Sequence, residues 1–253
     1  METIQEVSRP LNLSHAYNVR DLGGYINKNN CELMKGRILR SDSLHALDDE
    51  DVKKLLSYGE GVNYVIDLRS PYEIQKEPSV FALNNEAMYH SIPLYDNVQS
   101  NEIQRDFPES MCSIYIRILE GSRKQIAQVL RMISKNTCGC TLFNCTAGKD
   151  RTGVIAMLIL SLADVDERVI VSDYETSAKN MEPVFHIMKE QMKKKGYFMP
   201  EHLLKSDSAE MEETLDYLDE KYGGASGYLA TLDIKKAELD SLKRLLTNMN
   251  GDE

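Results

Sequence analysis

The sequence lacks any apolar run long enough to cross a membrane. A spanning helix needs about 20 predominantly apolar residues, and the apolar stretch 154–163 is far shorter. The first six residues carry Glu2 and Glu6 and have no apolar segment of the kind found in signal peptides. We therefore expect no stable membrane insertion and a cytoplasmic location, and we leave open secretion without a cleaved signal.

The chain also lacks an excess of positive charge and an even number of cysteines. The chain has 30 Lys and Arg against 40 Asp and Glu, a formal net charge of −10, which argues against nucleic acid as a partner. Five cysteines, an odd number in 253 residues, argue against a disulfide-stabilised fold. Cys138 and Cys140 lack the spacing of a zinc site, and no His pair lies nearby. We expect a turn there, leading into a strand.

Short apolar segments alternate with helical patterns through the first two thirds of the chain. Strands are predicted at 62–68, 88–94 and around 141–143, and helices at 48–57, 114–134 (broken at 121–122) and 154–160. Alternation of this kind predicts an α/β fold with a central, mostly parallel sheet flanked by helices. Such sheets bind ligands at the carboxyl ends of their strands.

The last third of the chain is predicted to be helical, with helices at 166–179, 183–195, 209–222 and 232–248. We expect one domain over residues 1–253, in which 165–230 form a helical insertion, cap or lid. The alternative is ordinary helical packing, because apolar residues at helical spacing usually form a core face.

The most informative segment reads Cys-Thr-Ala-Gly-Lys-Asp-Arg at 145–151 and continues with Thr152 and Gly153. It lies between the predicted strand and the predicted apolar helix. Small residues let a backbone curl so that successive N–H groups point at one centre, and such a nest at a helix N-terminus binds phosphate. The residues predicted to line this phosphate site are Thr146, Ala147, Gly148, Lys149 and Thr152.

Cys145 and Arg151 supply the chemistry. A helix N-terminus and a nearby cation both favour the thiolate form of a cysteine, which is its nucleophilic form. A guanidinium binds two phosphate oxygens at once. The arrangement suits transfer of a phosphoryl group to sulfur followed by hydrolysis, and the Thr152 hydroxyl is placed to assist departure of the sulfur.

The loop resembles that of the cysteine-dependent protein tyrosine phosphatase superfamily, whose signature is Cys-x5-Arg. In its full form it is similar to the bacterial group of atypical tyrosine and phosphoinositide phosphatases. The similarity extends from about Asn12 onward, through segments 18–24, 37–41, 67–70 and 222–224. It implies a phosphatase without metal or other cofactor, with Cys145 as nucleophile and Arg151 as phosphate clamp. It further implies a phosphorylated protein or a phosphoinositide as substrate.

The sequence departs from this pattern at Asn144, where the family usually has His. Asn can hydrogen-bond backbone groups but carries no charge, so the activation of Cys145 is open to test. The main alternative is therefore a phosphate-binding pseudophosphatase that captures phosphoproteins without turnover. Sulfur-transfer and arsenate-reducing enzymes use similar loops, but the extended Gly-Lys-Asp-Arg-Thr-Gly match favours phosphate esters.

Two aspartates are candidates for the acid that protonates the leaving oxygen. The resemblance favours Asp150, inside the loop, over Asp96, which follows a predicted strand and also fits an ordinary turn. Lys149 is either a second cation beside the substrate or an exposed loop lysine. Asp67 and Arg69 end a predicted strand at the expected site, and an internal ion pair that braces the loop is at least an equal alternative.

Overall fold

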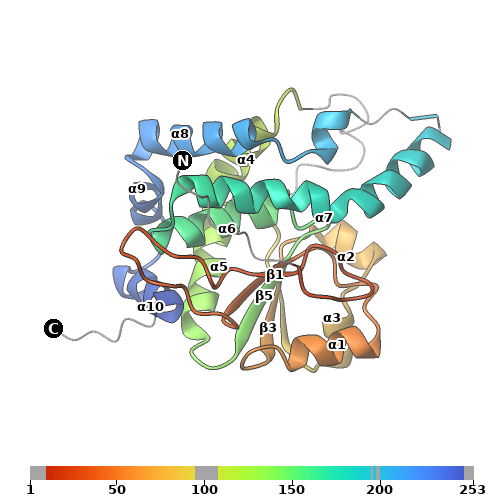
Figure 1. Cartoon of the computed structure of the whole chain (residues 1–253), viewed down its shortest axis with the longest axis horizontal. Helices are drawn as coiled ribbons and strands as arrows, with labels where there is room; N and C mark the ends of the chain where they lie inside the picture. Colours follow the sequence, from red (N-terminus) through yellow and green to blue (C-terminus); the bar gives the residue numbers. More distant parts are fainter. Residues whose placement is uncertain (1–9, 95–107, 195, 198–199, 248–253) are drawn as a thin grey trace.

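A computed structural model describes residues 10–94, 108–194, 196–197 and 200–247. Its centre is a five-stranded sheet with strand order β1-β2-β5-β3-β4 (Figure 1). Only β1 runs antiparallel to its neighbour, whereas β2, β5, β3 and β4 are parallel, as the sequence predicts. The strands are β1 (Arg20–Asp21), β2 (Ile38–Ser41), β3 (Val62–Asp67), β4 (Met88–Ser91) and β5 (Cys140–Asn144).

Helices cover the sheet and make up the C-terminal third of the described chain (Figure 1). They are α1 (Asp49–Leu56), α2 (Pro71–Lys76), α3 (Val80–Asn84), α4 (Met111–Gly121), α5 (Arg123–Lys135), α6 (Asp150–Leu162), α7 (Glu167–Lys194), the 3-10 helix η1 (Glu201–Leu204), α8 (Ser208–Tyr222), α9 (Ala225–Ala230) and α10 (Lys236–Thr247). α7 crosses beside the sheet, and its last turns extend past the rest of the molecule.

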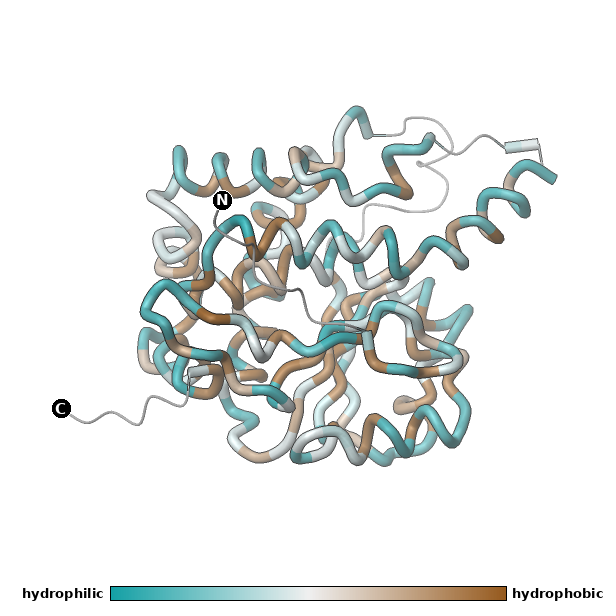
Figure 2. The backbone as a smooth tube through the Cα atoms, viewed as in Figure 1, coloured by the Kyte–Doolittle hydropathy of each residue, from teal (hydrophilic) through white to brown (hydrophobic). Residues whose placement is uncertain are grey.

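The alternation of side chains along the strands creates two cores, one on each face of the sheet. Leu142 joins a smaller core with residues of α1 and α3, including Val52 and Phe81. The next residue of β5, Phe143, joins the larger core with α4, α5, α6 and the C-terminal helices. Hydrophobic segments accordingly gather along the strands and the inner helices, while outer turns are hydrophilic (Figure 2). The fold is the predicted α/β architecture with a helical C-terminal region.

The carboxyl ends of the parallel strands meet in register at one edge. Asn144, the last residue of β5, pairs with Ser41 of β2 and with Asp67 of β3. Asp67 in turn pairs with Ser91 of β4. The segment that begins at Cys145 therefore leaves the sheet between the ends of two flanking strands.

The helices differ from the prediction at one break and include one short helix that was not predicted. Pro183 lies inside the continuous helix α7 instead of separating two helices. Ser177, Met181 and Phe185 are buried at four-residue spacing on both sides of it, and this packing keeps the helix continuous although proline removes a backbone donor. The short helix α9 was not predicted; it follows Gly223 and Gly224, whose positive φ angles of 71° and 102° end α8.

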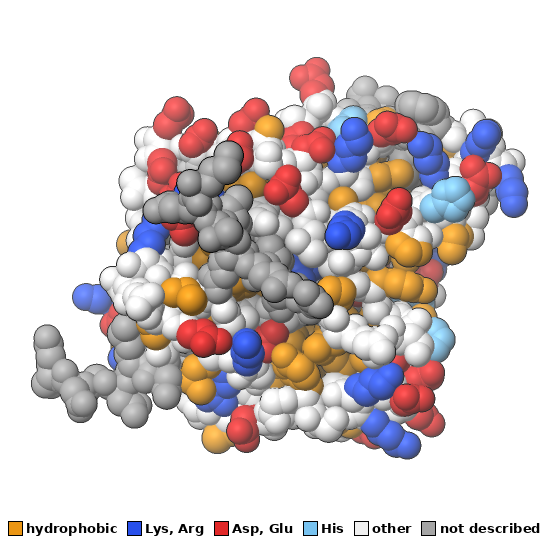
Figure 3. Space-filling model, in the orientation of Figure 1, with side chains coloured by type: hydrophobic (Ala, Val, Ile, Leu, Met, Phe, Trp, Pro, Cys, Tyr) orange, Lys and Arg blue, Asp and Glu red, His pale blue; other side chains and the backbone are white. Residues whose placement is uncertain are grey.

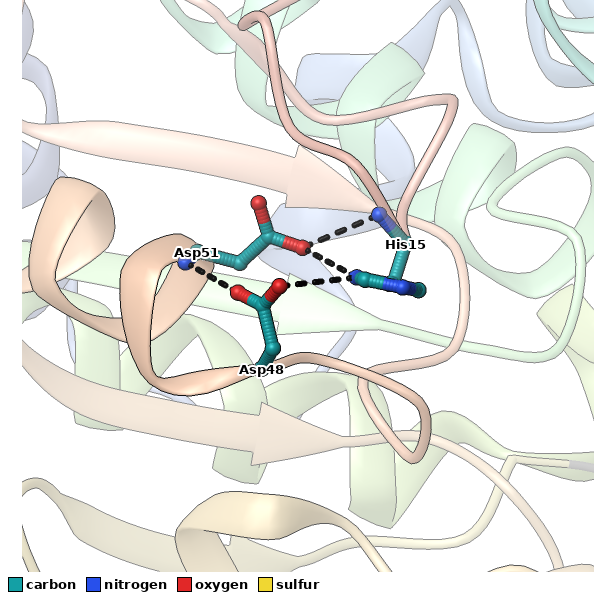
Figure 4. Close-up of side chains that lie close together, drawn as sticks. All are labelled: His15, Asp48 and Asp51. Carbon is teal, nitrogen blue, oxygen red and sulfur yellow. Dashed lines mark hydrogen bonds and ion pairs between the residues drawn. The ribbon is translucent and has the colours of Figure 1, made fainter.

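The segment before β1 is anchored to α1 by three side chains (Figure 4). Asp48 caps α1, and the buried Asp51 accepts hydrogen bonds from the backbone N–H groups of Ser14 (2.8 Å) and His15 (2.9 Å). The His15 Nδ1 lies 3.0 Å from Asp51 and 3.5 Å from Asp48. These contacts account for the cluster as a helix cap and a chain anchor, and they fix the path of the chain toward Asn18.

Candidate active site

The predicted phosphate loop connects β5 to α6 and packs tightly against the end of β2. Gly148 has a φ of +65°, a conformation that favours glycine. A Cβ atom there would lie 2.6 Å from the backbone of Ser41 and Asp42. Glycine is therefore required at this position for two independent reasons, conformation and space.

Three consecutive carbonyl groups of the loop accept hydrogen bonds from neighbouring segments. The Thr146 carbonyl accepts from the Ser43 N–H (3.0 Å). The Asn18 amide donates to the Ala147 carbonyl (3.0 Å) and to that of Gly148 (3.2 Å). In a trans peptide the N–H points away from the preceding C=O. The N–H groups of residues 147–149 therefore face the inner side of the loop, as a phosphate nest requires.

Cys145 is 2% exposed at the start of this loop. Asn144, directly before it, donates from its side-chain amide to the Cys145 carbonyl (3.4 Å). Through this long hydrogen bond Asn144 contacts the backbone of Cys145, but the neutral amide places no positive charge beside the thiol. Among the residues that the structure describes, neither the Asn144 Oδ1 nor the Thr152 Oγ1 has a hydrogen-bond partner, although both atoms are buried. The Thr152 hydroxyl is thus free to turn toward a group in the loop.

Arg151 is held by Glu73, a residue that the sequence analysis did not identify. The guanidinium donates from Nη1 to Glu73 Oε2 (2.7 Å) and from Nη2 to Glu73 Oε1 (2.8 Å). The Thr146 hydroxyl also donates to Glu73. Burial opposes the charge of Glu73, but the hydrogen bonds and charge of Arg151 outweigh it and lower the pKa of Glu73 to about 2. The carboxylate is therefore ionised across the physiological range.

A readable signal places Glu73 at this edge of the sheet. Ser70 caps α2, its hydroxyl accepting from the Glu73 N–H, while the Glu73 carboxylate accepts from the Ser70 N–H (2.8 Å). Ser-x-x-Glu with Pro71 at the first helical position is the sequence pattern of a capping box. Because this helix begins just after β3, its capping carboxylate lies at the carboxyl edge of the sheet, beside the phosphate loop.

Asp150 and Lys149 turn toward the helical region. The Asp150 carboxylate accepts from the Tyr115 hydroxyl (2.7 Å). Lys149 is 1% exposed, so it is not the exposed loop lysine of our alternative interpretation. Its ammonium donates to the carbonyls of Leu203 and Lys205, both at 2.7 Å, and lies 3.4 Å from Asp150. In this conformation the second cation of the loop fastens the loop to the segment around η1. Asp96, the alternative acid, lies outside the described residues.

Asp67 and Arg69 form a buried ion pair, with Arg69 Nη2 2.7 Å from Asp67 Oδ2. Arg69 also donates to the Ser43 hydroxyl (2.8 Å) and to the Glu77 carbonyl at the end of α2 (2.9 Å). Ser43 supports the loop at Thr146. This geometry favours the bracing interpretation, in which the pair connects α2 and the β2 end to the phosphate loop.

Charge on the surface is unevenly distributed. Exposed acidic residues follow α8 along one edge of the molecule (Figure 3); they include Glu212, Glu213, Asp216, Asp219 and Glu220. A surface of this charge repels anions, so it does not contribute to attracting a phosphate group. None of the helices in the described ranges is long and apolar enough to span a membrane.

Comparisons with known proteins agree with this site. A model of the tyrosine phosphatase family matches residues 11–248. A tyrosine-protein phosphatase of Nostoc commune is 30% identical over 221 residues, which cover 81% of this chain and 72% of that protein. A triple specificity protein phosphatase of Mycobacterium tuberculosis is 24% identical over 278 aligned residues, covering 92% of this chain and 98% of that protein.

Proposed function

The chain belongs to the tyrosine phosphatase family, and from this premise we propose that its phosphatase reaction runs through a phosphoryl group bound covalently to Cys145. The observation that carries this proposal is the arrangement of the loop. Its carbonyls are held on the outer side, which leaves the N–H groups of residues 147–149 to face a phosphate together with Arg151.

In the first step the Cys145 thiolate attacks phosphorus. An S–P bond forms as the P–O bond to the leaving alcohol breaks, and Asp150 gives its proton to the leaving oxygen. In the second step water attacks phosphorus and the S–P bond breaks, while Asp150 accepts the proton from the water. The Thr152 hydroxyl donates a hydrogen bond to the departing sulfur. Asp96 is the alternative acid in both steps.

Arg151 presents one edge to the protein and another to the substrate. Glu73 binds the end formed by Nη1 and Nη2. The side formed by Nε and Nη2 can then bind two equatorial oxygens of the phosphoryl group. Glu73 in this role orients the guanidinium before substrate arrives, so that no reorganisation is needed as charge develops on those oxygens.

We further propose that proteins with phosphotyrosine are the main substrates, with phosphoserine, phosphothreonine and phosphoinositides as a wider range. The name of the mycobacterial relative, a triple specificity phosphatase, supports a range wider than tyrosine. For a multiply phosphorylated headgroup, Lys149 would have to leave the carbonyls of Leu203 and Lys205. Lys149→Met should therefore reduce phosphoinositide turnover more than turnover of a phosphotyrosine peptide.

Turnover of a generic aryl phosphate, with titration by vanadate, tests the reaction. Rapid acid quench of the reaction with ³²P-labelled substrate should trap label on the protein. Cys145→Ser should lose both the trapped label and turnover, while still binding the substrate. Cys138→Ser is the matched control, because Cys138 is exposed and precedes β5. Binding of a phosphotyrosine peptide without any turnover by the unmodified protein would show the pseudophosphatase alternative instead.

A further inference from the structure

Two side chains hold the outer face of the phosphate loop, and neither belongs to the loop. The Asn18 amide binds the carbonyls of Ala147 and Gly148, as described above. Arg40, from β2, donates from Nη2 to the same Gly148 carbonyl at 2.7 Å. Asn18 and Arg40 are 0% and 1% exposed, so both act from the protein interior, on the side away from the substrate.

Asn18 and Arg40 are themselves held by residues on one face of α7. Asp173, Ser177 and Asn180 lie at i, i+4 and i+7, which places them on the same side of a helix. Asp173 is paired with Arg40, and the Asn180 amide donates to the Asn18 Oδ1 (3.0 Å).

A second arginine completes this connection. Arg20 donates from Nε to Asp173 (2.9 Å) and from Nη2 to the Ser177 hydroxyl (2.9 Å), and it also binds the Asn18 Oδ1. Although burial would raise the pKa of Asp173, the charges of Arg20 and Arg40 lower it, so the carboxylate is ionised when it orients them. The outer face of the loop is thus connected to α7 through charged and polar groups, of which Arg20, Arg40, Asn18, Asp173 and Ser177 are buried and Asn180 is partly exposed.

The contact between Arg40 and Gly148 affects the substrate side of the loop. A hydrogen bond from a charged donor to a carbonyl is stronger than one from a neutral donor. Hydrogen bonds that follow one another through a peptide group also polarise one another. The Gly148 carbonyl belongs to the same peptide group as the Lys149 N–H, which faces the inner side. A guanidinium on this carbonyl therefore makes that N–H a better donor to phosphate.

We propose that Arg40, held by Asp173 of α7, is a positioning residue that sets the phosphate affinity of the loop without touching the substrate. Asn18 and Asn180 provide a second, neutral connection between the same helix and the same loop. That the ligand of the loop is phosphate rests on the proposed function. If Arg40 acts in this way, α7 contributes to the phosphate affinity of the loop through Asp173.

Arg40→Lys tests the proposal, because lysine keeps the charge but cannot bind Asp173 and the Gly148 carbonyl with the same planar fork. The dissociation constant for inorganic phosphate is measured by titration calorimetry, and the amide shift of Lys149 by NMR. We expect the constant to rise about tenfold, as for loss of one charge-assisted hydrogen bond, and the Lys149 amide proton to move upfield. Arg37→Lys is the matched control, because Arg37 binds the carbonyls of Thr137 and Gly139 at the other end of β2.

A folded Arg40→Lys protein that binds phosphate as the unmodified protein does would overturn the proposal, as would an equal loss in Arg37→Lys. Should Arg40→Lys fail to fold, Asn180→Ala is the second test, because Asn180 is partly exposed and its amide donates to Asn18, which in turn binds the loop carbonyls. We expect it to weaken phosphate binding about threefold and to shift the amide signals of residues 148 and 149; unchanged values would refute the coupling. Phosphate binding without turnover by the unmodified protein would contradict the proposed reaction but leave this test intact.

Discussion

Replacing Glu73 with Gln should separate the orientation of Arg151 from its charge. Gln keeps the size of the side chain and one acceptor, but it loses the negative charge and one of the two hydrogen bonds at 2.7 and 2.8 Å. Hydrogen bonds to charged groups contribute about 1.5–3 kcal/mol. The two side chains are 18% and 30% exposed, so solvent screening favours the lower part of this range, about 2 kcal/mol.

This loss should fall on kcat more than on KM. An Arg151 that is no longer held must find its orientation during the reaction, and a loss of about 2 kcal/mol in the transition state slows kcat roughly 30-fold. The assay is steady-state turnover of an aryl phosphate, with inhibition by inorganic phosphate measured in parallel. Glu77→Gln is the control, because Glu77 ends the same helix and its carboxylate lies 3.9 Å from His45 instead of contacting the loop.

The pH dependence of stability gives a second measurement on the same variant. The folded-state pKa of Glu73, about 2, lies below the ordinary value of 4.5. Its stabilisation is therefore present in full above pH 4.5 and lost as the pH falls toward 2. The difference in unfolding free energy between the two proteins should shrink over that interval. A Glu73→Gln enzyme with unchanged kcat and tighter inhibition by phosphate would refute the reasoning, since Glu73 would then compete with the substrate.

Three further predictions concern the loop and its surroundings. Gly148→Ala should lower stability by about 2–4 kcal/mol in urea unfolding, because of its φ and of the contact with Ser41 and Asp42; a change below about 0.5 kcal/mol would contradict this. Burial raises the pKa of Asp42 from 3.8 to about 6, so its contribution to stability should fall by about 2 kcal/mol as the pH rises from 4 to 7. Asp42→Asn should remove this pH dependence of the unfolding free energy. Equal pH profiles of the unfolding free energy for the two proteins would contradict the role of Asp42. Asn144→His should make Cys145 react with iodoacetamide at lower pH than in the present protein, because a protonated ring favours the thiolate; identical profiles would show that position 144 does not control the thiol.

The parts of the site that depend on short-range pattern were predictable from the sequence. The strand, loop and helix around Cys145 are contiguous, so alternation, small residues and an apolar helix were enough to locate them. The parallel order of the sheet followed from alternating strands and helices. The ion pair of Asp67 and Arg69 was one of two interpretations, and the choice between them required the partners of Arg69 at Ser43 and Glu77.

The features that were not predictable from the sequence depend on contacts between distant segments. Glu73 and Arg151 are 78 residues apart, and although the capping box was readable, nothing in it indicates which arginine the carboxylate meets. Lys149 looks like a loop residue in sequence, yet its ammonium donates to two backbone carbonyls more than 50 residues away, which no sequence pattern marks. The helices predicted at 166–179 and 183–195 are one helix with Pro183 inside it, and the packing of Met181 and Phe185 around this proline is a tertiary effect.

The position of β5 in the middle of the sheet also determines the order in which the sheet can assemble. β5 pairs with β2 on one side and β3 on the other, so β2 and β3 are not neighbours. Until residues 140–144 are in place, the pairings of the finished sheet that the first four strands can make are limited to β1 with β2 and β3 with β4. Pairings that span about 100 residues form slowly, because loop-closure entropy must be overcome first. The strand that delivers the nucleophile is therefore also the strand that completes the sheet, and a nascent chain that has not reached residue 140 has neither the full sheet nor the thiol loop.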